Sequence, residues 1–271
     1  MVDGLVGSEM CIRDRLIMVF SLLLSLPLGA LNAAHHELGN GVQSNAPFSI
    51  QAQMCKLNEG VTIAQYDKLI EKYIKWSKKN DVETFFARQT PLFTHDTFNI
   101  SSKYDFVEFL AAPFEKQGEG WDLWLGTKEG QKLNEEWQSL ATCHVKMGSA
   151  NFVYANEEAL NKGNTRYAQW NWCSVRDGRT AEELMAFHKN VSDSMVGNTD
   201  AIGWLTFVPQ LGGAHVPEFA HVMLYPNVES VMKNGKRLAE GGWKRLREYE
   251  TEYANCSGSM LMIENVMNRP E

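Results

Sequence analysis

An internal repeat is the feature that most constrains how this chain can fold. Cys55 and Cys173 lie 118 positions apart, and further pairs recur at the same offset: Gly60 and Gly178, Thr62 and Thr180, Asn80 and Asn198, Pro91 and Pro209. After position 104 the offset becomes 113, with these pairs: Phe106 and Phe219, Pro113 and Pro226, Leu133 and Leu246, Cys143 and Cys256, Met147 and Met260. A constant offset with one local change indicates a structural unit that occurs twice.

Both copies predict the same order of elements. In the first copy we expect strands at 49–57, 83–90, 104–111 and 145–154, with helices after Thr62 and around 133–140. In the second we expect strands at 168–175, 201–208, 218–224 and 259–266, with helices after Thr180 and around 243–253. Both threonines are placed to cap the first turn of a helix. The order β-α-β-β-α-β is the ferredoxin-like pattern of an α+β fold.

This pattern divides the chain into a first repeat at 49–156, a linker at 157–167, a second repeat at 168–266 and a tail at 267–271. Both helices of such a repeat pack on one face of its sheet, so the other face is left bare. Two copies can bury these faces by packing sheet to sheet, and they often close into a barrel.

The tandem arrangement resembles the dimeric α/β-barrel superfamily, which includes antibiotic-biosynthesis-monooxygenase-like and stress-responsive barrel domains. The resemblance is one of topology and covers about residues 49–266. It implies a monomer that forms a pseudo-dimeric α/β barrel. The alternative is a pair of ferredoxin-like domains that pack otherwise, for example through their helices.

The N-terminal region predicts export. Residues 16–31 are apolar and are followed by small residues, a pattern typical of a secretory signal at 16–33 that is cleaved after Ala33. The apolar block is short for a bilayer span, so an uncleaved anchor is the less favoured alternative. Residues 1–15 contain VGSEMCIRDR, which resembles translated sequencing-adapter read-through, and residues 34–48 are expected to be flexible. The mature protein is then periplasmic or extracellular.

Four cysteines remain outside the leader, and each copy holds one at the end of its first strand and one near the start of its last. These two strands are antiparallel neighbours in the ferredoxin-like order 4-1-3-2, so their facing residues lie within disulfide range. We therefore predict the pairs Cys55–Cys143 and Cys173–Cys256. Free thiols and a four-cysteine zinc site are the alternatives, although an oxidising compartment opposes the first and the absence of a CxxC motif opposes the second.

Charge and motifs exclude several function classes. The net charge is −7, which argues against a nucleic-acid-binding protein. The chain contains no P-loop, dinucleotide-binding glycine motif, GxSxG, HExxH or CxxCH sequence, so we predict no resident cofactor.

Acid–base chemistry is suggested by two equivalent strand positions. Glu108 and His221 are related by the 113-residue offset and share a strand face with Phe106 and Phe219. If that face lines the barrel, the two side chains converge in an apolar chamber, with Arg88 beside them, and could act as catalytic residues or bind a polar ligand. The alternative is a hydrogen-bonded structural histidine.

A metal site is suggested at the new N-terminus. Cleavage after Ala33 would leave Ala34, His35 and His36 at the start of the mature chain. A free amine, two backbone amides and an imidazole suit square-planar copper(II). The alternative is a disordered terminus without a metal.

Three functions remain compatible with these features. The first is binding of a small molecule in a cavity between the repeats. The second is a cofactor-independent monooxygenase or isomerase that uses His221 and Glu108. The third is a structural or interaction protein. An inward-pointing His221 would favour the enzyme, an apolar cavity would favour the binding protein, and a filled barrel would favour the structural role.

Overall fold

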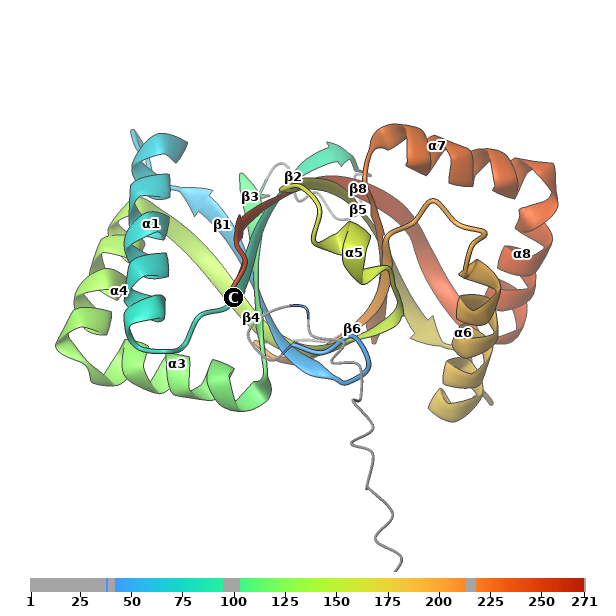
Figure 1. Ribbon diagram of the computed structural model, residues 1–271, viewed down its shortest axis with the longest axis horizontal. Coiled ribbons are helices and arrows are strands. Elements are labelled where there is room, and N and C mark those ends of the chain that lie inside the picture. The colour runs from blue at the N-terminus through green and yellow to red at the C-terminus, as the bar shows by residue number, and fades with distance from the viewer. Residues whose placement is uncertain (1–37, 39–41, 95–102, 213–217, 271) are drawn as a thin grey trace, which may run out of the picture. The chain divides into compact units, whose positions relative to one another are not determined.

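The computed structural model describes Leu38 and residues 42–94, 103–212 and 218–270. Its strands form a closed antiparallel barrel in the order β1-β3-β2-β8-β5-β7-β6-β4. The strands are β1 (Phe48–Leu57), β2 (Phe85–Phe93), β3 (Phe106–Ala112), β4 (Ala141–Ala155), β5 (Thr165–Val175), β6 (Gly203–Leu211), β7 (Phe219–Tyr225) and β8 (Ala254–Asn268). Figure 1 looks along the axis of this ring of strands.

The helices lie outside the ring, apart from a short one at its mouth. Figure 1 shows α1, α3 and α4 against the first half of the barrel and α6, α7 and α8 against the second, with α5 at the opening. The helices are α1 (Ile63–Lys79), α3 (Phe114–Gly126), α4 (Lys128–Leu140), α5 (Glu157–Leu160), α6 (Ala181–Met195), α7 (Val228–Arg237) and α8 (Trp243–Glu252). Within the described ranges, none of the helices is long and apolar enough to cross a membrane.

The two halves of the barrel have the same strand order. The first runs β4-β1-β3-β2 and the second runs β8-β5-β7-β6, which is the predicted 4-1-3-2 order in each. The halves are joined edge to edge, because β2 pairs with β8 and β4 pairs with β6. The bare sheet faces therefore curve around one shared lumen, and no strand edge of the ring is left unpaired.

The predicted helix caps are present. Thr62 Oγ1 accepts a hydrogen bond from the Gln65 backbone N–H, and Gln65 Oε1 accepts one from the Thr62 N–H. Thr180 and Glu183 form the same reciprocal arrangement at the start of α6. Each of these two capping boxes satisfies two backbone N–H groups that the first helical turn leaves without a partner.

Among the described residues, each half contains a helix that the sequence does not predict. The predicted second helices correspond to α4 and α8, while α3 and α7 precede them. The corner between α3 and α4 is tight, because a Cβ on Gly130 would lie 2.4 Å from the Trp124 carbonyl oxygen. In the second half the chain bends at Gly241, whose φ of 127° favours glycine.

The pleat of the strands decides which side chains enter the lumen. Phe109, Trp170, Phe207 and Val222 belong to the buried cluster inside the barrel. Trp170 stacks on Phe109 with 5.2 Å between the ring centroids. Aromatic rings from both halves thus fill much of the shared core.

Both predicted disulfides are present. Cys55 bonds to Cys143 and Cys173 bonds to Cys256, with 4.1 Å between the Cα atoms in each pair. The bonded residues face each other directly in the pairings of β1 with β4 and of β5 with β8. Each disulfide therefore links the first and last strands of its half.

Several predicted segments differ from the observed elements or lie beyond them. β4 and β8 begin four and five residues earlier than expected, at Ala141 and Ala254, and the linker segment 157–167 contains α5 and the start of β5. The leader at 1–33, with His35 and His36, lies outside the described residues.

Removal of one disulfide should destabilise the barrel. Each bond closes a loop of more than 80 residues, so the Cys55→Ser/Cys143→Ser variant should lose about 2–4 kcal/mol of unfolding free energy in urea. Peptide mapping without reductant checks the pairing, and a Cys55–Cys173 peptide would contradict it.

Candidate functional site

Glu108 lies on the outer face of β3, beneath α1. Phe106 and Leu110 share this face and pack with Tyr66 and Ile70 of the helix. The lumen instead receives the alternate residues of β3, Val107, Phe109 and Ala111. The structure therefore places Glu108 between sheet and helices, completely buried.

The Glu108 carboxylate is held by several donors. It accepts hydrogen bonds from Gln53 Nε2 at 2.6 Å, from the Tyr66 hydroxyl at 2.9 Å and from Arg88 Nε at 2.9 Å. Arg88 also donates to Asp67 Oδ1 at 2.6 Å. Burial raises the pKa of Glu108, while the Arg88 charge and these hydrogen bonds oppose the rise. Arg88 therefore lies beside Glu108, but beneath α1 and not in the barrel lumen, where the sequence pattern predicted both.

His221 occupies the corresponding outer position in the second half, beneath α6 and α8. Its Nδ1 accepts from Trp204 Nε1 at 2.9 Å, and its Nε2 lies 2.7 Å from the Tyr249 hydroxyl. Because an indole can only donate, the neutral ring carries its proton on Nε2 and donates to Tyr249. Tyr249 in turn contacts His188 Nε2 at 3.2 Å.

Both histidines are neutral at ordinary pH. Burial and the neighbouring His188 lower the pKa of His221 to about 3, and burial lowers the pKa of His188 to about 4. Both ring nitrogens of His221 are used by neighbouring side chains. The geometry is that of a hydrogen-bonded core histidine.

The expectation that Glu108 and His221 converge in the barrel is wrong. Glu108 contacts residues of the first half, whereas His221 contacts residues of the second. The faces of β3 and β7 that carry Phe106 and Phe219 are covered by helices and do not line the lumen. Arg88 accordingly joins Glu108 alone.

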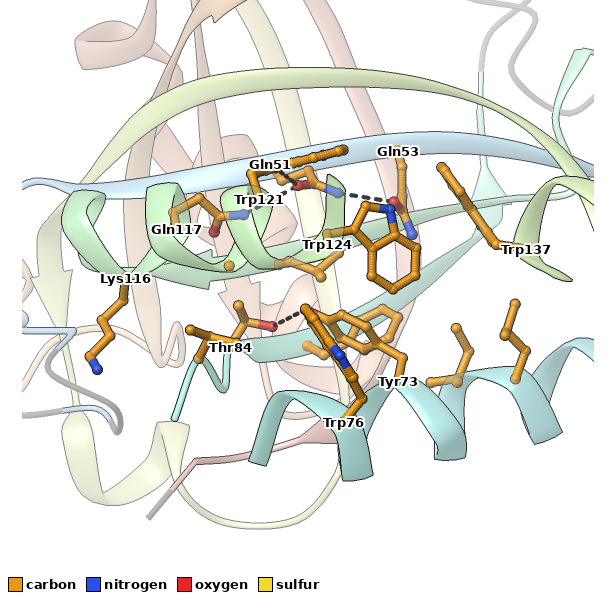
Figure 2. Close-up of a pocket in the computed structure, with 16 residues that line it drawn as sticks. Gln51, Gln53, Tyr73, Trp76, Thr84, Lys116, Gln117, Trp121, Trp124 and Trp137 are labelled. Carbon is orange, nitrogen blue, oxygen red and sulfur yellow. Dashed lines mark hydrogen bonds between the residues drawn. The ribbon is translucent and has the colours of Figure 1, made fainter. Parts of the chain in front are cut away.

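A pocket of about 70 Å³ lies between the first-half sheet and helices α1, α3 and α4. Figure 2 shows Tyr73 and Trp76 on one side of it and the glutamines of β1 on the other. Its aromatic lining consists of Tyr73, Trp76, Phe86, Trp121, Trp124 and Trp137. Because Trp121, Trp124 and Trp137 are only half-buried, the pocket reaches the surface at their edge.

A chain of amide groups runs along the wall of this pocket. Trp121 Nε1 and Gln117 Nε2 both donate to Gln51 Oε1, at 2.9 and 3.2 Å. Gln51 Nε2 donates to Gln53 Oε1 at 3.0 Å, and Gln53 donates to Glu108. The indole at one end can only donate and the carboxylate at the other only accepts, so the orientation of every amide between them follows.

The amide chain is open at Gln117. Its Oε1 is buried and has no hydrogen-bond partner among the described residues. Buried acceptors are nearly always paired, and leaving one without a donor costs about 1–3 kcal/mol. The pocket therefore combines apolar aromatic walls with one unused acceptor, an arrangement suited to a small molecule that donates a hydrogen bond.

The barrel lumen contains a second cavity of about 80 Å³. Phe48, Phe109, Trp170 and Phe207 belong to its walls. Polar side chains gather at the β2–β8 seam, where Glu264 faces Gln89 across the strand pair. A cavity between the halves is thus present, but His221 does not line it.

The sequence prediction missed Gln51, Gln53, Gln117 and Trp121. The sequence feature that could have identified this site is the spacing of Gln51 and Gln53, which places two amides on one face of an otherwise apolar strand. Gln117 and Trp121 could not be placed because α3 was not predicted. Across the described residues, no cluster of three or more His, Cys, Asp or Glu side chains could hold a metal ion.

Loss of the Arg88 charge should destabilise the fold strongly. Arg88→Met leaves the Glu108 carboxylate buried without its counter-charge, which should cost about 3–5 kcal/mol in urea unfolding. Lys72→Met, which breaks the exposed pair with Glu136, should cost no more than about 1 kcal/mol. Similar losses in the two variants would contradict the assigned network.

Stability should fall in acid because of His221 and His188. Both have a lower pKa in the folded state, so between pH 6.5 and about 3 the unfolded state binds more protons. The contribution of the two neutral histidines to the free energy of unfolding is then fully present above pH 6.5 and is lost as the pH falls toward their folded-state pKa values. Urea unfolding at several pH values should show that the free energy of unfolding depends less steeply on pH in His221→Gln than in the wild type. The exposed His144→Gln should keep the wild-type slope, and an unchanged slope in His221→Gln would contradict the assignment.

Comparisons with known proteins give a likeness of fold. No family model matches the chain, and no curated protein matches it. A candidate monooxygenase from Fusobacterium nucleatum subsp. nucleatum is 8% identical, covers 84% of this chain and 95% of its own, and has a TM-score of 0.53. A candidate monooxygenase from Lactobacillus acidophilus is 12% identical, covers 83% of this chain and 98% of its own, and has a TM-score of 0.48. A chlorite dismutase variant from Candidatus Nitrospira defluvii is 9% identical, covers 82% of this chain and 92% of its own, and has a TM-score of 0.48. The first of these supports a related fold.

Proposed function

We propose that this protein is an exported, monomeric small-molecule-binding member of the dimeric α/β-barrel superfamily, built from two tandem ferredoxin-like repeats. The repeat offsets, the equal strand order of the halves and the two disulfides support this proposal. The seams that close the barrel lie within one chain, which supports a monomer.

The ligand binds in the pocket between β1 and helices α1 and α3. The unpaired Gln117 Oε1, buried in an aromatic pocket, is the observation that carries this assignment. A ligand N–H or O–H would supply the missing donor, and its apolar body would contact the tryptophans. The inter-repeat cavity expected from the sequence is a second binding space.

The ligand is neutral. The nearby charges are already matched, because Arg88 lies between Glu108 and Asp67, and Lys116 pairs with Asp81 and Glu119. A charged ligand would lose its hydration without finding a free counter-charge. A small phenol or a similar apolar molecule with one donor fits these conditions. The 70 Å³ alone is smaller than the roughly 150 Å³ cavity that holds benzene, so part of the ring extends through the open edge at Trp121, Trp124 and Trp137.

An enzyme that uses Glu108 and His221 together has no support in this geometry. The two side chains lie in separate cores, and His221 has no ring nitrogen free for a ligand. A purely structural barrel is also less favoured, because cavities are present both in the lumen and beneath the helices. Binding without chemistry is the remaining function.

Phenol and toluene test the proposed pocket, because they differ in one hydrogen-bond donor. Phenol should bind about tenfold more tightly, as one hydrogen bond to a buried acceptor contributes about 1.4 kcal/mol. Gln117→Met should remove this preference while retaining toluene binding. The measurements are tryptophan fluorescence and two-dimensional amide NMR titrations of the full chain.

Gln138→Met is the matched control, since Gln138 is exposed on α4 and does not line the pocket. It should bind both probes as the wild type does. Equal affinity of the wild type for phenol and toluene, or a phenol preference that survives in Gln117→Met, would rule out the assignment.

A further inference from the structure

The lumen cavity has an apolar wall and a charged end. The wall is formed by side chains of both halves, with Phe109 and Phe207 among them. The charged end is lined by Arg166, Glu264 and Arg269. It lies near α5, which Figure 1 shows at the mouth of the barrel.

Glu264 is fully engaged by its strand neighbours. Arg166 Nε donates to its Oε1, and Gln89 Nε2 donates to its Oε2 at 2.5 Å. Trp170 Nε1 in turn donates to Gln89 Oε1 at 2.8 Å. This carboxylate therefore forms an ion pair with Arg166, and each of its oxygens accepts a hydrogen bond.

Arg269 has no such counter-charge. Its Nη2 donates to the Gly163 carbonyl oxygen at 2.7 Å, and no carboxylate among the described residues lies within ion-pair distance. Arg166 and Arg269 both lie over the Phe85 ring, with 5.2 and 5.8 Å from guanidinium carbon to ring centroid. Among the residues that the structure describes here, two guanidinium groups thus share one carboxylate, which leaves one excess positive charge at this end of the cavity.

The charge of Arg269 is disfavoured in the free protein. Partial burial and the nearby Arg166 lower the pKa of Arg269, while Glu264 opposes the shift. An anion placed at this end of the cavity would offset both effects through its opposite charge. A guanidinium also presents a planar set of donors that matches a carboxylate.

We propose that the barrel lumen binds a short-chain monocarboxylate, with its carboxylate at Arg269 and its alkyl chain along Phe109 and Phe207. The size of the cavity sets the chain length. A protein cavity of roughly 150 Å³ holds benzene, so about 80 Å³ holds a smaller body, such as propionate. A second carboxylate would be buried in the apolar part without a partner, which excludes dicarboxylates.

This site is separate from the proposed pocket beneath α1 and α3. It is lined by the lumen face of the strands, by α5 and by Arg269 just after β8, whereas Gln117 lies on α3 over the outer face of the sheet. Gln117→Met should therefore leave carboxylate binding unchanged. The two proposals can fail independently.

Propionate and its neutral isostere propionamide test the lumen site at pH 7. Calorimetric titration of the full chain should detect propionate, with at least tenfold weaker binding of propionamide. Arg269→Met should weaken propionate binding at least tenfold. The affinity of Arg269→Lys for propionate should fall between those of the wild type and Arg269→Met, because lysine keeps the charge and loses the planar donor set. The matched control is Arg247→Met on α8, which should bind as the wild type does.

Line broadening of ¹³C-propionate provides a second measurement that does not depend on the stability of the variants. Intermolecular contacts between its methyl protons and the rings of Phe109 or Phe207 would support the proposal. Equal binding of propionate and propionamide, or full propionate affinity in Arg269→Met, would overturn it. Equal competition by chloride and phosphate would also overturn it, since that result indicates an unspecific anion site only.

Discussion

The central strands β3 and β7 are buried on both faces, and this constraint governs the polar networks of the structure. One face of each half-sheet turns to the shared lumen, and the other is covered by that half's own helices. In β3 all seven residues are buried, including Glu108. A polar side chain on such a strand cannot turn to water, so it must find its partners inside the protein. The hydrogen-bond networks of this molecule follow from that requirement.

The two halves meet this requirement with different chemistry at matching positions. At Glu108 the first half buries a charge and matches it with Arg88. At His221 the second half buries a neutral ring between an indole and a phenol. The seam between the halves has its own polar group, because Glu264 faces Gln89 on β2 and Arg166 on β5. A one-residue slip of β8 would turn Glu264 to the other face and leave both partners without it.

Much of the fold could be predicted from the sequence, because two offsets and two threonine caps define the element order. The disulfides followed from strand adjacency alone. The face that lines the lumen could not be predicted, since β3 reads FVEFLAA and is apolar on both sides. That ambiguity misplaced Glu108 and His221. The aromatic pocket was missed for another reason: α3 contains two internal glycines and a weak apolar pattern, so no helix was expected to carry Gln117 and Trp121 beside the glutamines of β1.

Edge-to-edge closure also has a consequence for how the chain is completed during synthesis. β2 is made early, yet its outer edge is covered only by β8, the last strand of the barrel. All strands of the first half are made before those of the second, but one side of its sheet remains an open template until the final strand arrives. An unpaired edge of this kind invites pairing with another chain. The interval between the emergence of β2 and that of β8 is therefore the period in which the nascent barrel is most exposed to misassembly.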